Sequence, residues 1–109
     1  MAALPVFCTA TNVVQLDGDL DIFCRARTQA KLDTLGDTAF AIVDLRGATA
    51  VDAAFLGQLA VLRKVNAQKG GTIVLVVTNP AIRKLLHVVG FDRAFRIVES
   101  IEEAHAIGS

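Results

Sequence analysis

The chain has 109 residues, of which 53% are hydrophobic, and its eleven lysines and arginines balance eleven aspartates and glutamates. This is the length of one domain, residues 1–109, and so large an apolar fraction excludes a disordered chain. A net charge of zero argues against a dedicated nucleic-acid or anionic-membrane binder. With two histidines, two cysteines and no tryptophan or tyrosine, the composition favours a binding protein over an enzyme.

The N-terminal part has two short apolar runs that predict strands, Val6–Thr9 and Val13–Leu16. The turn dipeptide Asp17-Gly18 follows the second run. Because Asp-Gly is typical of tight turns between strands, it predicts a hairpin-like pairing in this region.

Apolar residues at helical spacing predict a helix over Ile22–Leu35 that ends at Gly36. Its expected buried side consists of Ile22, Ala26, Ala30, Leu32 and Leu35. The almost wholly apolar run Phe40–Leu45 then predicts a central strand that is buried on both faces.

The carboxylate of Asp52 is a good helix N-cap, and it predicts a helix from there to Gln68. Gly70-Gly71 ends this helix, and Ile73–Val77 is the second buried strand.

Asn79-Pro80 predicts the start of a third helix, which extends to Val89 before Gly90. Phe95–Val98 is a last strand, and Ser100–Glu103 has the pattern of a capping box before a short terminal helix.

These elements follow the order β-β-α-β-α-β-α-β-α. Strands separated by single helices predict an α/β fold with a mixed, mostly parallel sheet of about five strands and helices packed on it.

The sequence offers little for catalysis, cofactors or metals. It contains no GxGxxG, GxxxxGK[ST] or GxSxG motif, and His87 and His105 are expected to be helix-end partners of the dipole. No side chains have metal-ligand spacing, so we predict no catalytic residue, no cofactor and no metal. Cys8 and Cys24 are expected to be free thiols.

The N-terminal residues lack the charge and apolar run of a signal peptide. No apolar stretch approaches the roughly 20 residues that a membrane helix needs. We therefore expect a cytoplasmic protein without membrane insertion.

The segment between the Phe40–Leu45 strand and the helix at Asp52 is the best place for a site, because binding sites in parallel α/β sheets form at strand ends. Its residues Asp44-Leu45, the loop Arg46–Val51 and Asp52 followed by Leu56-Gly57 resemble the signature of the STAS domain, typified by bacterial anti-sigma factor antagonists. Other segments resemble that family in order and spacing, so that the resemblance covers nearly the whole chain: Gly18–Asp21, Gly70–Leu75, Pro80–Leu86, Gly90–Asp92 and Ser100–Ala104.

The resemblance implies a phosphorylation switch. In the family, the residues after the motif aspartate are commonly Ser-Ser or Ser-Thr, and the second is phosphorylated by a partner kinase that is also the anti-sigma factor. The unphosphorylated antagonist binds that kinase and frees the sigma factor. Here these positions are Ala53 and Ala54, so the hydroxyl of the usual phosphoacceptor is absent at Ala54. Thr49 is the nearest hydroxyl, either a substitute phosphoacceptor or a turn residue.

Helical geometry separates two sides of the helix after Asp52. Its core stripe is expected to contain Phe55, Leu56, Leu59, Ala60 and Leu62, whereas Ala54, Gln58, Val61 and Val65 lie on another side. The two valines either pack under a neighbouring helix, or are singly exposed, or form a partner-binding face. The candidate partner-binding residues are Arg46, Thr49, Asp52, Ala53, Ala54, Gln58, Val61 and Val65.

The leading hypothesis is a non-enzymatic, anti-sigma factor antagonist-like interaction module that acts by partner switching in bacterial transcription regulation. Its expected partner is an anti-sigma factor or serine kinase. One alternative is a constitutive STAS accessory subunit of a membrane transport complex, and another is a small-ligand sensor. Nucleic acid is not an expected partner, and the oligomeric state, including a homodimer, stays open.

Overall fold

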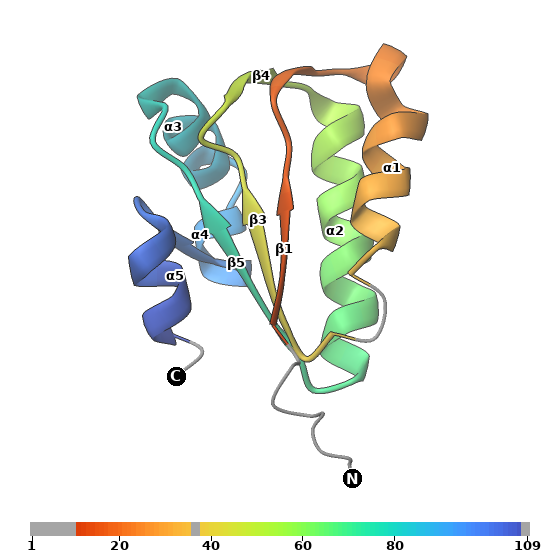
Figure 1. Ribbon diagram of the computed structural model, residues 1–109. Coiled ribbons are helices and arrows are strands. Elements are labelled where there is room, and N and C mark those ends of the chain that lie inside the picture. Colours follow the sequence, from red (N-terminus) through yellow and green to blue (C-terminus); the bar gives the residue numbers. More distant parts are fainter. Residues whose placement is uncertain (1–10, 36–37, 108–109) are drawn as a thin grey trace, which may run out of the picture.

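The computed structural model in Figure 1 describes residues 11–35 and 38–107. Its strands are β1 (Thr11–Gln15), β2 (Gly18–Leu20), β3 (Phe40–Asp44), β4 (Ala48–Val51), β5 (Thr72–Val76) and β6 (Arg96–Val98). Its helices are the 3-10 helix η2 (Ile22–Cys24) and the α-helices α1 (Arg25–Asp33), α2 (Ala53–Gln68), α3 (Pro80–Val88), α4 (Phe91–Ala94) and α5 (Ile101–Ile107). The predicted strand Val6–Thr9 and the stop at Gly36 lie outside the described residues.

Four strands form the main sheet in the order β1-β3-β5-β6, and each neighbouring pair is parallel. The predicted α/β class is therefore confirmed. The apolar runs that predicted buried central strands correspond to β3 and β5, in which Ile42, Val43, Val74 and Leu75 have no exposed surface.

The strand order explains the layers of the molecule. Each new strand is added to the same side of the sheet, so connections of one hand place their helices on one face. Leu32 of α1, Leu59 of α2 and Leu86 of α3 accordingly share one core with alternate strand residues. On the other face, Ala104 of α5 packs on Ile42, Val74 and Val76. Figure 1 shows α1 and α2 on one side of the strands and α5 on the other.

The structure differs in three respects from the single sheet and the order of nine elements that were predicted. β1 and β2 do not form a hairpin across Asp17-Gly18, because β1 pairs with β3 and β2 pairs with β4. Residues 48–51, predicted as loop, form β4, and β2 and β4 make a separate two-stranded parallel sheet. The short helix α4 was also not predicted. Gly18, with φ of +78°, allows the chain to leave the main sheet.

Only two of the five residues predicted on the buried side of the first helix, Leu32 and Leu35, are buried. Asp21 caps the 3-10 helix η2, and the α-helix begins only at Arg25. Because a 3-10 helix has about 3.0 residues per turn, helical spacing counted from Ile22 does not match that of the α-helix. Thr28, Leu32 and Leu35 are buried, whereas Ile22, Ala26 and Ala30 are exposed.

The predicted caps of the later helices are present. Asn79 Oδ1 accepts a hydrogen bond from the Ala81 amide at 2.9 Å, with Pro80 as the first residue of α3. Ser100 Oγ accepts from the Glu103 amide at 3.1 Å and donates to the Glu103 carboxylate at 3.3 Å. Within the described residues, no helix is long and apolar enough to cross a membrane.

Candidate functional site

Asp52 connects the N-terminus of α2 to the segment that precedes α1. Its Oδ1 accepts from the Phe55 amide at 3.0 Å, which is the predicted helix cap. Its Oδ2 accepts from the Ile22 amide at 3.1 Å. A single carboxylate therefore holds η2 beside the first turn of α2.

We expect two substitutions at this position to separate the two contacts. Asp52→Ala should lower the free energy of unfolding by about 1–2 kcal/mol, because α2 loses its cap. Asp52→Asn should retain most of that stability, since asparagine caps helices about as well, but the amide nitrogen that replaces Oδ2 cannot accept a hydrogen bond from Ile22. Hydrogen exchange should then be faster at the Ile22 amide, and an unchanged exchange rate there would contradict the bridging role.

A groove lies between α1 and α2, and residues after Asp52 form one of its walls. The part nearest the N-terminus of α2 is a hollow of about 540 Å³. It is lined by Arg25 and Gln29 of α1 and by Ala53, Ala54, Gly57, Gln58 and Val61 of α2. An adjoining hollow of about 250 Å³ extends past Val65 to Asp33. Val61 is 63% exposed and Val65 is 42% exposed. We call these two hollows together the α1/α2 groove.

Gln58, a candidate partner-binding residue predicted on the surface, is buried in the structure. Its amide nitrogen donates to the Arg25 carbonyl at 3.0 Å and to Gln29 Oε1 at 3.2 Å. It therefore joins α1 to α2 at the floor of the groove, and its amide nitrogen is engaged within the domain. Ala60, predicted in the core, is exposed.

The fold of the domain does not require glycine at position 57. Gly57 lies inside α2, it is exposed, and a Cβ built on it meets nothing within 4 Å. Glycine destabilises a helix interior by about 0.5–1 kcal/mol relative to alanine. A glycine on the wall of a groove does, however, allow another backbone to approach closely.

We therefore expect Gly57→Ala to raise the free energy of unfolding by about 0.5–1 kcal/mol. The same change should weaken binding of any partner that occupies the α1/α2 groove. Chemical denaturation and an affinity measurement on the same variant test both effects. Unchanged affinity would place the partner away from Gly57.

The sequence did not single out Phe23 as a surface residue, although it is 93% exposed. Ile22 was predicted to be buried, but it is 60% exposed. Asp21 Oδ1 accepts from the Phe23 amide at 3.0 Å and from the Cys24 amide at 3.2 Å, so this segment is held in place. An aspartate followed by two large apolar residues could have indicated a capped, outward-facing turn. Cys24 is a free thiol, whereas Cys8 lies outside the described residues.

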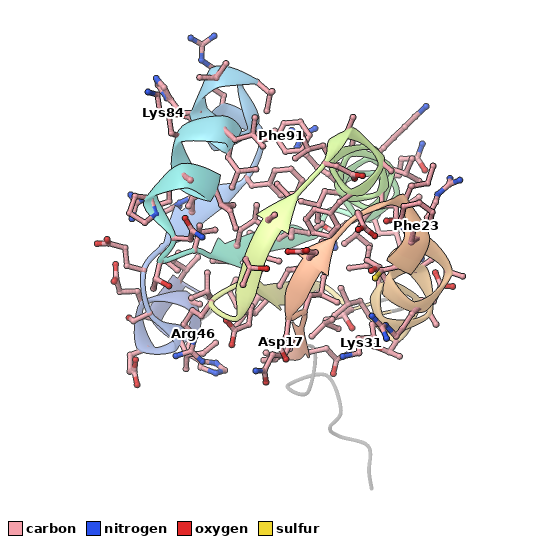
Figure 2. All side chains as sticks on the ribbon, turned by 90° about the horizontal axis from the view of Figure 1, so that it is seen from above. Asp17, Phe23, Lys31, Arg46, Lys84 and Phe91 are labelled. Atoms are coloured by element: carbon pink, nitrogen blue, oxygen red, sulfur yellow. The ribbon has the colours of Figure 1, made fainter. Side chains whose placement is uncertain are left out.

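Arg46 lies outside the α1/α2 groove. Figure 2 shows Arg46 beside α5 and Phe23 on the opposite side of the molecule. Arg46 forms a two-point ion pair with the buried carboxylate of Asp44, through Nε at 3.0 Å and Nη2 at 2.8 Å. These hydrogen bonds from Arg46 lower the pKa of Asp44, although burial opposes the shift.

We expect Asp44→Asn to lower the free energy of unfolding by about 1–2 kcal/mol at neutral pH. The pKa of folded Asp44 lies below its ordinary value of 3.8. Its ionised form therefore stabilises the fold above that value, and this contribution is lost as the pH falls through the lower folded pKa. Urea unfolding of both proteins should show their difference shrinking in acid; a difference independent of pH would contradict the assignment.

Thr49 also lies outside the groove. It is on β4, and its hydroxyl donates to Asp19 Oδ1 of β2 at 2.6 Å. A phosphate on Thr49 would stand beside this carboxylate, and repulsion between like charges disfavours that modification. The cross-strand contact gives Thr49 a structural role in the β2–β4 sheet.

The described residues contain no group of three or more histidine, cysteine, aspartate or glutamate side chains that could hold a metal ion. His87 Nδ1 lies 2.5 Å from Asp92 Oδ2, and this hydrogen bond lowers the pKa of Asp92. His87 therefore has a carboxylate partner in addition to its place in the last turn of α3.

A family model described as the STAS domain matches residues 8–104 of this chain. The chain belongs to the STAS domain family. A STAS-domain containing protein of Pseudomonas aeruginosa is 38% identical over 56 residues, which are 51% of this chain and 55% of that protein, so the match spans about half the length of this relative.

Two solved structures show the same STAS fold. An anti-sigma factor antagonist from Mycobacterium paratuberculosis aligns with a TM-score of 0.82 at 19% identity, covering 91% of this chain and 86% of that chain. A sulfate transporter family protein from Wolinella succinogenes aligns with a TM-score of 0.78 at 20% identity, covering 94% and 88%. The fold therefore occurs both in anti-sigma factor antagonists and in a transporter family.

Proposed function

We propose that this STAS domain is an anti-sigma factor antagonist-like interaction module in the regulation of bacterial transcription. It is not an enzyme; it acts in the cytoplasm by binding an anti-sigma factor or a related serine kinase. The observation that carries the proposal is the placement of exposed apolar surface at the N-terminus of α2. Ala53, Gly57 and Val61 line this end of the α1/α2 groove, where the family resemblance places the phosphoacceptor. The segment η2, which carries the exposed Phe23, is held to the start of α2 by Asp52.

The binding surface proposed here is narrower than the set of residues predicted from sequence. It consists of Ile22 and Phe23 on η2 together with the α1/α2 groove. Asp52 acts on it by holding η2 against α2. Arg46 and Thr49 are left out because they lie outside the groove and are engaged in contacts within the domain. Gln58 remains part of the groove lining, although its amide nitrogen already donates to α1.

The groove entrance has no hydroxyl that could turn binding off. Ala53 and Ala54 occupy the first turn of α2, so the charge of about −1.5 to −2 that a phosphate brings cannot be added there. We infer that binding is constitutive with respect to phosphorylation at these two positions and is controlled by the amounts of the two proteins.

The test is reconstitution with the anti-sigma factors of the source organism. The chain should displace the sigma factor from one of them, and after incubation with that partner and ATP its mass should be unchanged. Failure to bind any of these anti-sigma factors would overturn the proposed function. Phosphorylation within residues 46–56 would overturn only the constitutive binding.

The absence of a hydroxyl at Ala54 favours one second candidate, a constitutive accessory subunit of a membrane transport complex. Such a subunit needs no phosphoacceptor. Co-purification from detergent-solubilised membranes would distinguish it, because a transport subunit should remain with the membrane complex and displace no sigma factor.

A further inference from the structure

The neutral chain has an uneven distribution of charge. Residues 53–98 contain seven lysines and arginines but only one carboxylate, so that this segment carries a net charge of +6 with histidine neutral: Arg63, Lys64, Lys69, Arg83, Lys84, Arg93 and Arg96 against Asp92. Much of this charge is on α3, α4 and β6, and none of it belongs to the α1/α2 groove. Figure 2 shows Lys84 on the side of the molecule opposite Phe23.

Part of this charge surrounds a hollow of about 540 Å³ between α3, α4 and β6, which we call the basic hollow. Its basic side chains are Arg83, Lys84 and His87 of α3 and Arg96 of β6, and Phe95 and Ile97 supply apolar atoms. Pockets for small molecules commonly have volumes of about 300–1,000 Å³. A second hollow of about 240 Å³, lined by Arg63 and Arg93, shares Asp92, Phe95 and Arg96 with it.

The positive charge of the basic hollow is only partly balanced within the domain. Arg83 forms an ion pair of 2.8 Å with Glu99, and Asp92 is held by His87 at 2.5 Å. Across the part of the chain that the structure describes, Lys84 and Arg96 take part in no ion pair. Two permanent charges at this hollow are therefore available to a ligand, and Arg83 could exchange its exposed partner Glu99 for a stronger one.

The surroundings favour a small ligand over a large anionic surface. Glu99 follows β6 and pairs with Arg83 at the edge of the hollow. Duplex nucleic acid or a lipid surface extending beyond the hollow on this side would meet this carboxylate. A compact ligand would contact the cations and one carboxylate, Asp92, which is already paired with His87. Guanidinium groups match the geometry of phosphate oxygens.

We propose that the basic hollow binds a small polyanion with adjacent phosphate groups, held by Lys84 and Arg96 with Arg83 and His87 at its edge. This site goes beyond the proposed function and does not depend on it. Two adjacent phosphates are favoured over one because exposed single ion pairs contribute little, whereas several cations acting on one ligand contribute together.

Inorganic pyrophosphate is the probe. The full chain should bind it saturably in calorimetry, and NMR shifts should be confined to residues 83–97. Arg96→Gln and Lys84→Gln should each weaken binding at least about tenfold, the loss expected when one charge-assisted hydrogen bond is removed. Lys64→Gln is the matched control, since Lys64 is an exposed cation of the same basic segment that lines neither hollow, and its affinity should be unchanged.

The outcomes separate the alternatives. No saturation with pyrophosphate, or equal losses in Arg96→Gln and Lys64→Gln, would overturn the site. Vesicles containing phosphatidylglycerol test a lipid head group as the source of the phosphate. Sedimentation of the chain with these vesicles without saturable binding of pyrophosphate would overturn the small-ligand assignment. Retained pyrophosphate binding without sedimentation would support it.

Discussion

Phe23→Ala is expected to weaken binding of the protein partner by about 10- to 100-fold, the effect of removing an aromatic hot spot from an interface. The ring is 93% exposed, so it contributes little to the core. Its backbone is nevertheless fixed by Asp21, and its neighbour Ile22 is fixed by Asp52. Calorimetric titration with the partner identified by reconstitution measures the loss, and the melting temperature should not change.

Val88→Ala provides the matched control for this measurement. Val88 is also an exposed apolar side chain, at 70%, but it lies at the end of α3 away from η2. Its removal should leave affinity unchanged. Equal affinities of Phe23→Ala and the unsubstituted chain would remove η2 from the interface, and a lower melting temperature would show that the ring supports the fold instead.

Ala54→Asp is expected to reduce partner affinity by at least tenfold, about 1.4 kcal/mol, because it places a desolvated charge in the α1/α2 groove. The domain itself should not be destabilised, since a carboxylate in the first turn of a helix interacts favourably with the helix dipole. Partner affinity should therefore fall while the free energy of unfolding of the domain does not. Ala60→Asp is the control on the same helix, exposed and outside the groove.

Ala54→Ser tests the same position in the opposite direction. Serine adds one hydroxyl, so the variant should bind the partner as the unsubstituted chain does. If that partner is a kinase, ATP should then convert the variant, and only the variant, into a phosphorylated and weakly binding form. Affinity loss in Ala54→Ser without ATP would indicate a steric limit at the groove and contradict the expected switch.

The sequence predicted best those features that depend on neighbouring residues. The apolar runs of β3 and β5 and the caps at Asp52, Asn79 and Ser100 are local, and each was located correctly. The family resemblance then supplied the position of Ala54 at the start of α2. These features were enough for the fold class and for the end of the sheet at which we propose the binding surface.

The remaining features depend on residues far apart in the chain. β4 has four residues and is a strand because it pairs with β2, about 30 positions earlier. The sequence predicts Gln58 on the surface, and it is buried because α1 packs against it, with the Arg25 carbonyl accepting its hydrogen bond. The exposure of Phe23 depends on one turn of 3-10 helix, which changes the phase of the helical pattern.

The two contacts of the Asp52 carboxylate have a thermodynamic consequence. Because η2 and α2 are already joined in the free domain, the loss of conformational entropy that accompanies loop ordering is largely absent from association. Binding should then resemble rigid docking, with a heat-capacity change that reflects only the surface removed from water. Affinity at this surface would then depend on complementarity of shape and charge, and the entropy cost of ordering the backbone would contribute very little.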